Sequence, residues 1–164
     1  MISEKLSAIL KTLRQFVQEE LVPLEKDFVA RPFPELVPRL EEKREKVKEL
    51  GLWAPQLPAK VGGLGLSLTE FARVSEELGR TPMGHYVFNC QAPDAGNLEI
   101  LMEYGTPEQQ KKWMQPLVRG DIRSCFSMTE PEFAGSNPTW MHTTAVTDGN
   151  DYVCLLYTSD AADE

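Results

Sequence analysis

The spacing of apolar residues changes near Gly120-Asp121, and this change limits the folds open to the chain. Before it, apolar residues recur at steps of three and four, which places them on one face of an α-helix. After it, residues 123–129 and 142–147 mix β-branched, aromatic and small side chains in short runs typical of strands. Helices followed by strands predict a mainly α fold, in which a helical bundle domain joins the first strands of a β domain.

The ends of several helices can be predicted from capping residues. A first apolar stripe runs from Leu6 to Leu21, and a second helix is expected from Pro34 to Leu50, just before Gly51. Residues 67–70 and 106–109 each have the form of a capping box, with a hydroxyl followed three positions later by Glu or Gln. The residues expected to face the core include Leu40, Leu50, Leu68, Leu78, Trp113 and Leu117.

Composition excludes several classes of function. The net charge of −8 argues against nucleic-acid binding, which needs a basic face. No apolar run approaches the roughly 20 residues of a membrane span, and the N-terminus lacks the apolar core of a signal peptide, so a cytoplasmic protein is expected. Cys90, Cys125 and Cys154 form no C-x-x-C pair and, with His85 and His142, no metal-ligand cluster. The cysteines are predicted to be reduced, and both histidines to be hydrogen-bonded structural residues.

The last eleven residues, 154–164, differ in character from the rest of the chain. They resemble the translation of a transposon adapter used in sequencing libraries. We therefore expect natural sequence to end near Val153, and we exclude the tail from the prediction of the fold. The alternative is a natural polar C-terminus.

Residues 126–138 combine features that suit a ligand site. A strand-like run delivers the hydroxyl of Thr129, Pro131 stops the run, and the small pair Gly135-Ser136 follows. Backbone amides next to small residues can approach anionic or carbonyl-rich groups closely. Taken alone, the pattern also fits a strand that leaves into a tight loop.

The same run resembles the flavin-binding signature of the acyl-CoA dehydrogenase superfamily, in which T-E-P is followed by A-G-S or A-S-S. Four further stretches match the family in order and spacing, so that the resemblance covers roughly residues 1 to 153. They are residues 61–67, 75–80, 104–111 and 120–123. The resemblance implies an N-terminal helical domain over 1–121, the start of the middle β-barrel domain over 122–153, and FAD as the cofactor.

Carried over by position, the resemblance implies five cofactor-binding residues. Phe126, Met128 and Thr129 would lie along the flavin ring, with Thr129 hydrogen-bonded to it. Gly135 and Ser136 would lie beside the flavin phosphates and the CoA thioester arm, and Ser136 would also contact substrate. Glu130 belongs to the motif and is interpreted as an acceptor for loop hydrogen bonds.

The resemblance implies the α,β-dehydrogenation of an acyl-CoA thioester to the trans-2-enoyl-CoA, as in fatty acid β-oxidation. It also implies an electron-transfer flavoprotein as the electron acceptor and a full-length enzyme that is a homo-oligomer. The catalytic glutamate of the family lies in a C-terminal domain beyond this sequence. The 164 residues alone are therefore predicted to be inactive and to hold FAD poorly. The alternatives are a flavin oxidase or monooxygenase of the same fold, and a non-catalytic binding or scaffold protein.

Residues 89–97 resemble a stretch found in one branch of the superfamily, which acts on long or branched acyl-CoAs. Their backbone amides would line the acyl pocket. The other interpretation is that Asp94 caps the helix that follows it.

Overall fold

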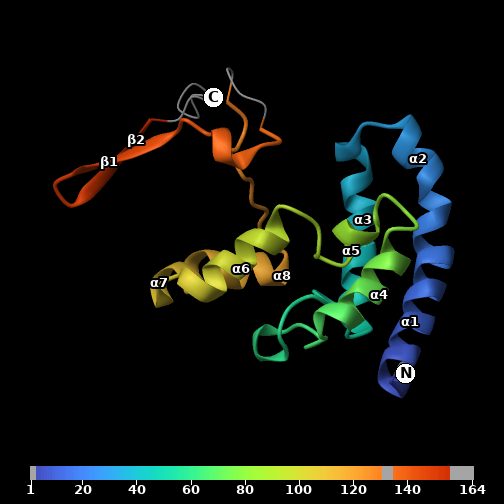
Figure 1. The fold of residues 1–164 in the computed structure, drawn as a ribbon. Coiled ribbons are helices and arrows are strands. Elements are labelled where there is room, and N and C mark those ends of the chain that lie inside the picture. The colour runs from blue at the N-terminus through green and yellow to red at the C-terminus, as the bar shows by residue number, and fades with distance from the viewer. Residues whose placement is uncertain (1–2, 131–134, 156–164) are drawn as a thin grey trace. The chain divides into compact units, whose positions relative to one another are not determined.

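A computed structural model describes residues 3–130 and 135–155. The chain forms two compact units that divide between Ser124 and Cys125 (Figure 1). The first unit is helical, as predicted. Its α-helices are α1 (Glu4–Phe16), α2 (Glu25–Ala30), α3 (Phe33–Glu49), α4 (Leu68–Leu78), α5 (Gly84–Val87), α6 (Asp94–Tyr104), α7 (Pro107–Gln109) and α8 (Gln115–Arg119).

The first helix begins at Ser3, whose side chain accepts a hydrogen bond from the amide of Leu6 at 3.2 Å. A five-residue π-turn, η1 (Val17–Leu21), interrupts the α-helical pitch, and a short 3-10 turn, η2 (Val22–Leu24), leads into α2. Both sides of the π-turn contribute buried residues to the same core, which explains the continuous apolar stripe in the sequence. The buried residues of this stretch are Leu6, Leu13, Phe16, Val17, Leu21 and Leu24.

Helix α3 packs its leucines inward but ends one residue before the predicted boundary. Leu36, Leu40 and Val47 are buried, and Pro34 lies in the first turn, where its missing N–H costs no intrahelical hydrogen bond. Leu50, which was predicted to be buried, is 49% exposed, so that prediction was wrong. It is the C-cap residue of α3, where the chain turns away through Gly51 at φ 67°.

Helix α4 begins with the predicted capping box. The Ser67 hydroxyl accepts from the Glu70 amide, and the Glu70 carboxylate accepts from the Ser67 amide at 2.9 Å. Val74 and Leu78 are buried, whereas Leu68 is 84% exposed, contrary to prediction, because it lies at the first position of the helix, beyond the core. Helix α4 packs against α1.

The remaining helices contribute further apolar residues to the core. Leu98 of α6 is fully buried, and Thr106 starts α7 with the second predicted capping box. Another π-turn, η4 (Gln110–Met114), joins α7 to α8. Met114 and Leu117 are buried, but Trp113 is 48% exposed, contrary to prediction, because the wider π-turn shifts which residues face the core.

The second unit contains a 3-10 turn, η5 (Pro138–Trp140), and the antiparallel strands β1 (Thr144–Asp148) and β2 (Asp151–Leu155). The predicted hairpin is confirmed, with Asp148 opposite Asp151 and Gly149 at φ 62° in the two-residue turn. Residues 123–129 form no strand, in contrast to the prediction, because no partner strand lies beside them in the described part of the chain. The tail predicted at 154–164 lies outside the described residues beyond Leu155.

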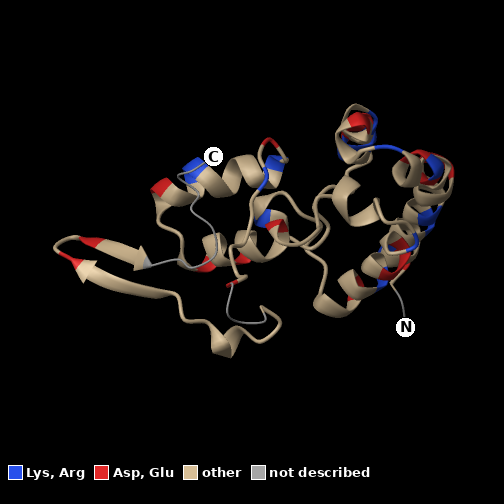
Figure 2. Ribbon diagram, turned by 90° about the horizontal axis from the view of Figure 1, so that it is seen from above, with Lys and Arg blue, Asp and Glu red and all other residues tan. Residues whose placement is uncertain are grey.

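Figure 2 colours the positions of the basic and acidic residues along the ribbon. Several of them in the helical unit form ion pairs with residues of another helix or turn. Arg14 of α1 pairs with Glu77 of α4, and Lys43 and Lys46 of α3 both reach Glu20, at 2.7 and 3.0 Å. Among the described helices, none has the length and apolar character needed to span a bilayer.

Candidate functional site

The chain leaves the helical unit through a glycine that no other residue can replace without rearrangement. Gly120 ends α8 in the left-handed conformation, at φ 78°, and its amide donates to the carbonyl of Leu117. A methyl group at this position would overlap the guanidinium of Arg44 and lie 2.7 Å from the ring of Trp53. The predicted break at Gly120-Asp121 is confirmed, and it directs residues 121–124 toward α6.

Arg44 is the buried cation that fixes this exit. Its side chain is 1% exposed, its Nη1 donates to the carbonyl of Tyr86 at 2.6 Å, and its Nη2 donates to the carbonyl of Gly120 at 3.4 Å. The guanidinium also lies 4.7 Å from the ring centroid of Trp53 and 4.9 Å from that of Tyr86. Arg44 therefore links α3 to two segments that are far away in the sequence, at Tyr86 and at Gly120.

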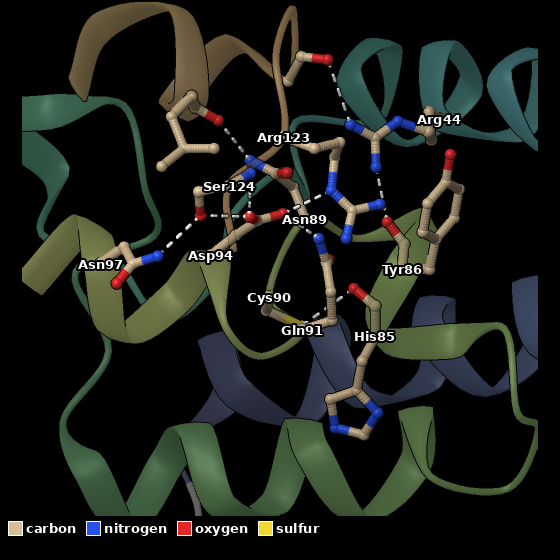
Figure 3. Close-up of polar contacts among 12 residues, drawn as sticks. Arg44, His85, Tyr86, Asn89, Cys90, Gln91, Asp94, Asn97, Arg123 and Ser124 are labelled. Atoms are coloured by element: carbon tan, nitrogen blue, oxygen red, sulfur yellow. Dashed lines mark hydrogen bonds and ion pairs between the residues drawn. The ribbon is translucent and has the colours of Figure 1, made fainter. Parts of the chain in front are cut away.

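The carboxylate of Asp94 accepts four hydrogen bonds, and the residue has no exposed surface (Figure 3). Oδ1 accepts from the amide of Ser124 at 2.8 Å and from its hydroxyl at 2.6 Å. Oδ2 accepts from Nε of Arg123 and from Nε2 of Gln91, both at 2.5 Å. Asn97 completes the group by donating to the Ser124 hydroxyl at 2.9 Å.

These partners keep Asp94 ionised despite its burial. Burial alone raises the pKa of a carboxyl group, but the hydrogen bonds from Ser124 and the charge of Arg123 outweigh it and lower the pKa of Asp94 below its usual value. The interpretation of Asp94 as a simple helix cap was incomplete. It is the first residue of α6, yet its strongest partners lie 29 and 30 positions further along the chain.

Residues 125–129, in the second unit, have no regular secondary structure. Phe126 is 54% exposed, Thr129 is exposed, and Met128 is half-buried. The predicted flavin contacts therefore include an aromatic ring and a hydroxyl group that are open to solvent.

Glu130 is bound by the two residues that directly precede β1, His142 and Thr143. Its carboxylate, 3% exposed, accepts from the amide of His142 at 2.8 Å, from the amide of Thr143 at 2.7 Å and from the Thr143 hydroxyl at 2.6 Å. The hydrogen bond from the Thr143 side chain, followed by that from the His142 amide, lowers the pKa of Glu130. The prediction that Glu130 accepts loop hydrogen bonds is confirmed, and a carboxylate engaged in this way is unsuited to act as a base.

Gly135 lies beside Thr129. A methyl group built on Gly135 would lie 3.5 Å from the Thr129 hydroxyl and 3.9 Å from the carbonyl oxygen of Met128. The structure thus brings together three of the five predicted residues. Ser136, like Phe126, is exposed, and Asn137 accepts from the amide and hydroxyl of Thr139 at 3.2 and 2.7 Å.

His85 and Cys90 belong neither to the residues around Asp94 nor to those around Glu130, and they lie in buried or partly buried positions. His85 Nε2 lies 2.8 Å from the Ser75 hydroxyl, which confirms the predicted hydrogen-bonded histidine, and burial lowers the pKa of His85. Burial raises the pKa of Cys90 to about 12. Within residues 3–130 and 135–155, no group of three or more His, Cys, Asp or Glu residues is placed to hold a metal ion.

Residues 3–121 match the N-terminal domain of acyl-CoA dehydrogenases. The chain is 41% identical over 160 residues to acyl-CoA dehydrogenase family member 11 of Gallus gallus, covering 92% of this chain and 20% of that protein. The chain therefore spans about a fifth of the length of this relative.

Solved structures similar to this chain also include acyl-CoA dehydrogenases. A Mycobacterium abscessus protein assigned as an acyl-CoA dehydrogenase superposes with a TM-score of 0.85 at 38% identity, over 94% of this chain and 41% of that one. A glutaryl-CoA dehydrogenase from Mycobacterium smegmatis, in complex with FADH2, superposes with a TM-score of 0.64 at 28% identity, over 93% of this chain and 37% of that one. On this evidence, the chain belongs to the acyl-CoA dehydrogenase family.

Proposed function

We propose that the chain is the N-terminal part of an FAD-dependent acyl-CoA dehydrogenase, with residues 1–121 as the helical domain and residues 122–153 as the start of the middle β domain. The match of residues 3–121 to the N-terminal domain supports these limits, as does the division of the chain after Ser124. The substrate is an acyl-CoA thioester, and the product is the trans-2-enoyl-CoA.

The proposed flavin contacts are Phe126, Met128, Thr129, Gly135 and Ser136. The observation that carries this proposal is the return of Gly135 to within van der Waals reach of the Thr129 hydroxyl. A glycine backbone beside a hydroxyl group, on a segment that also carries an exposed aromatic ring, suits a flat, polar-edged ring with phosphates attached. The residues present therefore fit a flavin.

Each of these residues has a defined task. FAD, when bound, supplies the acceptor for the hydride that leaves the β-carbon of the acyl group. Phe126 and Met128 provide apolar surface for its ring, Thr129 provides a hydrogen bond, and the amides of Gly135 and Ser136 provide donors for anionic oxygens. Orientation of substrate against the ring is the main contribution of such residues to the rate.

The base that removes the α-proton is proposed to be a glutamate outside these 164 residues, because Glu130 is fully engaged in the loop. An electron-transfer flavoprotein is the proposed electron acceptor. The 164-residue chain by itself is expected to be inactive.

The proposal is tested by anaerobic titration of the full-length enzyme with acyl-CoA thioesters of different chain length. Bleaching of the flavin absorption band by one of them, and no bleaching with the 164-residue chain plus FAD, is the expected result. A full-length protein that binds no flavin would refute the proposal. Rapid reoxidation of the reduced flavin by oxygen would instead identify a flavin oxidase or monooxygenase.

The substitution Gly135→Ala tests the flavin contacts directly. The added methyl group meets the Thr129 hydroxyl at 3.5 Å, an ordinary contact distance, so the variant is expected to fold as the wild type does. The methyl group fills the space beside that hydroxyl, however, and is expected to weaken FAD binding about ten-fold or more, the effect of about 1.4 kcal/mol. Gly96→Ala is the matched control, because nothing lies within 4 Å of its added methyl group. Unchanged FAD affinity in Gly135→Ala would contradict the assignment.

A further inference from the structure

The segment formed by residues 124–130, here called the linking segment, carries three of the five proposed flavin contacts, Phe126, Met128 and Thr129. Residues 125–129 make no strand, so the regular hydrogen-bond ladder of a sheet does not set their course. An extended chain without such a ladder samples many backbone conformations. The geometry of the flavin contacts must then depend on what holds the two ends of the linking segment.

At its first residue, the linking segment is held by Asp94. The amide and the hydroxyl of Ser124 both donate to Oδ1, at 2.8 and 2.6 Å. The preceding residue, Arg123, donates from Nε to Oδ2 at 2.5 Å and is 43% exposed, while the Asp94 side chain is fully buried. Since both backbone and side chain of Ser124 are bound, its position and orientation are fixed together.

At its last residue, the linking segment is held through its own carboxylate. Glu130 accepts from two consecutive amides, those of His142 and Thr143, and from the Thr143 hydroxyl. These donors directly precede β1, so the end of the linking segment is tied to the start of the hairpin. Gly135 and Ser136 lie in the sequence between Glu130 and these donors.

We propose that Asp94 and Glu130 are positioning residues, which set the placement of the flavin contacts by fixing the two ends of the linking segment. This inference rests on the proposed function, because it takes Phe126, Met128 and Thr129 as flavin contacts. Neither carboxylate is among the proposed flavin contacts. Both act before binding, by removing conformations that would otherwise have to be lost when the cofactor binds.

A carboxylate is required at both positions because every partner is a donor. An ionised carboxylate presents acceptors only, whereas an amide of the same shape carries an N–H group on one side. Asp94→Asn therefore directs a donor against Arg123 and Gln91, and Glu130→Gln directs one against the amides of His142 or Thr143. Each substitution closely keeps the volume and weakens the anchor, because a donor replaces one of the two carboxylate oxygens and the negative charge is lost.

The test uses Asp94→Asn and Glu130→Gln, with Ser67→Ala as control. Ser67→Ala removes the capping box of α4, which lowers stability away from the linking segment. Hydrogen exchange of the Ser124, His142 and Thr143 amides, which the two carboxylates bind, is measured in the 164-residue chain. FAD dissociation and the flavin absorption spectrum are measured in the full-length enzyme, at temperatures matched to the melting point of each variant.

The expected result is faster exchange of the Ser124 amide in Asp94→Asn and of the His142 and Thr143 amides in Glu130→Gln. In both variants the FAD dissociation constant is expected to rise about ten-fold and the flavin spectrum to change, since each loses hydrogen bonds to a charged group. Ser67→Ala should leave all three unchanged. FAD affinity and a spectrum equal to wild type in both anchor variants would overturn the proposal. A wild-type enzyme that binds no flavin would instead overturn the proposed function, and this failure is distinct because it needs no variant.

Discussion

Replacing Asp94 with asparagine should destabilise the helical unit by about 2–3 kcal/mol, because the Asp94 carboxylate is fully buried and accepts four hydrogen bonds. The asparagine oxygen can still accept from the amide and hydroxyl of Ser124. The new amide nitrogen, however, faces the two donors now bound to Oδ2, Arg123 Nε and Gln91 Nε2. Two hydrogen bonds to a charged group are lost.

The size of the effect follows from the surroundings of each donor. A hydrogen bond to a charged group contributes roughly 1.5–3 kcal/mol, and a buried donor without a partner costs a similar amount. The Arg123 side chain is 43% exposed and can bind water instead, which reduces its share to about 1 kcal/mol. Gln91 is partly buried, and the loss of its hydrogen bond to Asp94 brings the total loss of stability to about 2–3 kcal/mol.

The assay is urea unfolding followed by circular dichroism, with Asp121→Asn as the matched control. Asp121 pairs with Arg119 at 2.7 Å, but both side chains are at least half exposed, so its loss should cost below about 0.5 kcal/mol. With a urea dependence of about 2 kcal/mol per molar, Asp94→Asn should lower the unfolding midpoint by about 1 M or more. A midpoint equal to that of Asp121→Asn would refute the reasoning.

Three further measurements test other parts of the structure. The pKa of Asp94 is lowered in the folded chain, so the contribution of its charge to stability is complete above the unfolded pKa of about 3.9 and is lost as the pH falls through the folded pKa. The difference in unfolding free energy between wild type and Asp94→Asn should therefore shrink below about pH 4, and a difference that persisted there would contradict the assignment of charge. Leu78→Ala should cost about 3 kcal/mol in urea unfolding, because Leu78 is fully buried, whereas Leu68→Ala, at a residue 84% exposed, should cost under about 0.5 kcal/mol. Alkylation of the native chain with iodoacetamide, followed by mass spectrometry, should modify the exposed Cys125 and Cys154 but spare Cys90, whose pKa is raised to about 12; labelling of Cys90 at an equal rate would show that its site opens readily.

Local signals in the sequence were enough to predict the helix starts. The capping boxes at Ser67 and Thr106 are confirmed because both partners lie within three residues of each other, and the hairpin between Asp148 and Asp151 is confirmed for the same reason. The side chains that face the core were predicted less well. Leu68 and Trp113 follow the expected spacing, yet one lies at a helix start and the other in a π-turn.

Contacts between distant parts of the chain could not be predicted in this way. The residues around Asp94 do not indicate that it binds Arg123 and Ser124, about 30 positions away. An aspartate that only caps a helix would stand in the same kind of local sequence. The run 123–129 has the composition of a strand, but a strand also needs a partner beside it. The five predicted flavin contacts came from resemblance to a family, and their roles stay a prediction.

The π-turn between α1 and α2 determines how this region tolerates changes in chain length. Each residue of an α-helix advances the helical wheel by about 100°, and the π-turn Val17–Leu21 accommodates one residue more than an α-turn. Deleting a single residue within it, such as the exposed Gln18, would restore regular pitch and shorten the path to α2. Leu21 and Leu24 would then rotate away from the core that Phe16 and Val17 still face. Insertions and deletions that preserve this fold are therefore expected to avoid residues 17–21 and to fall in the loops that follow α3.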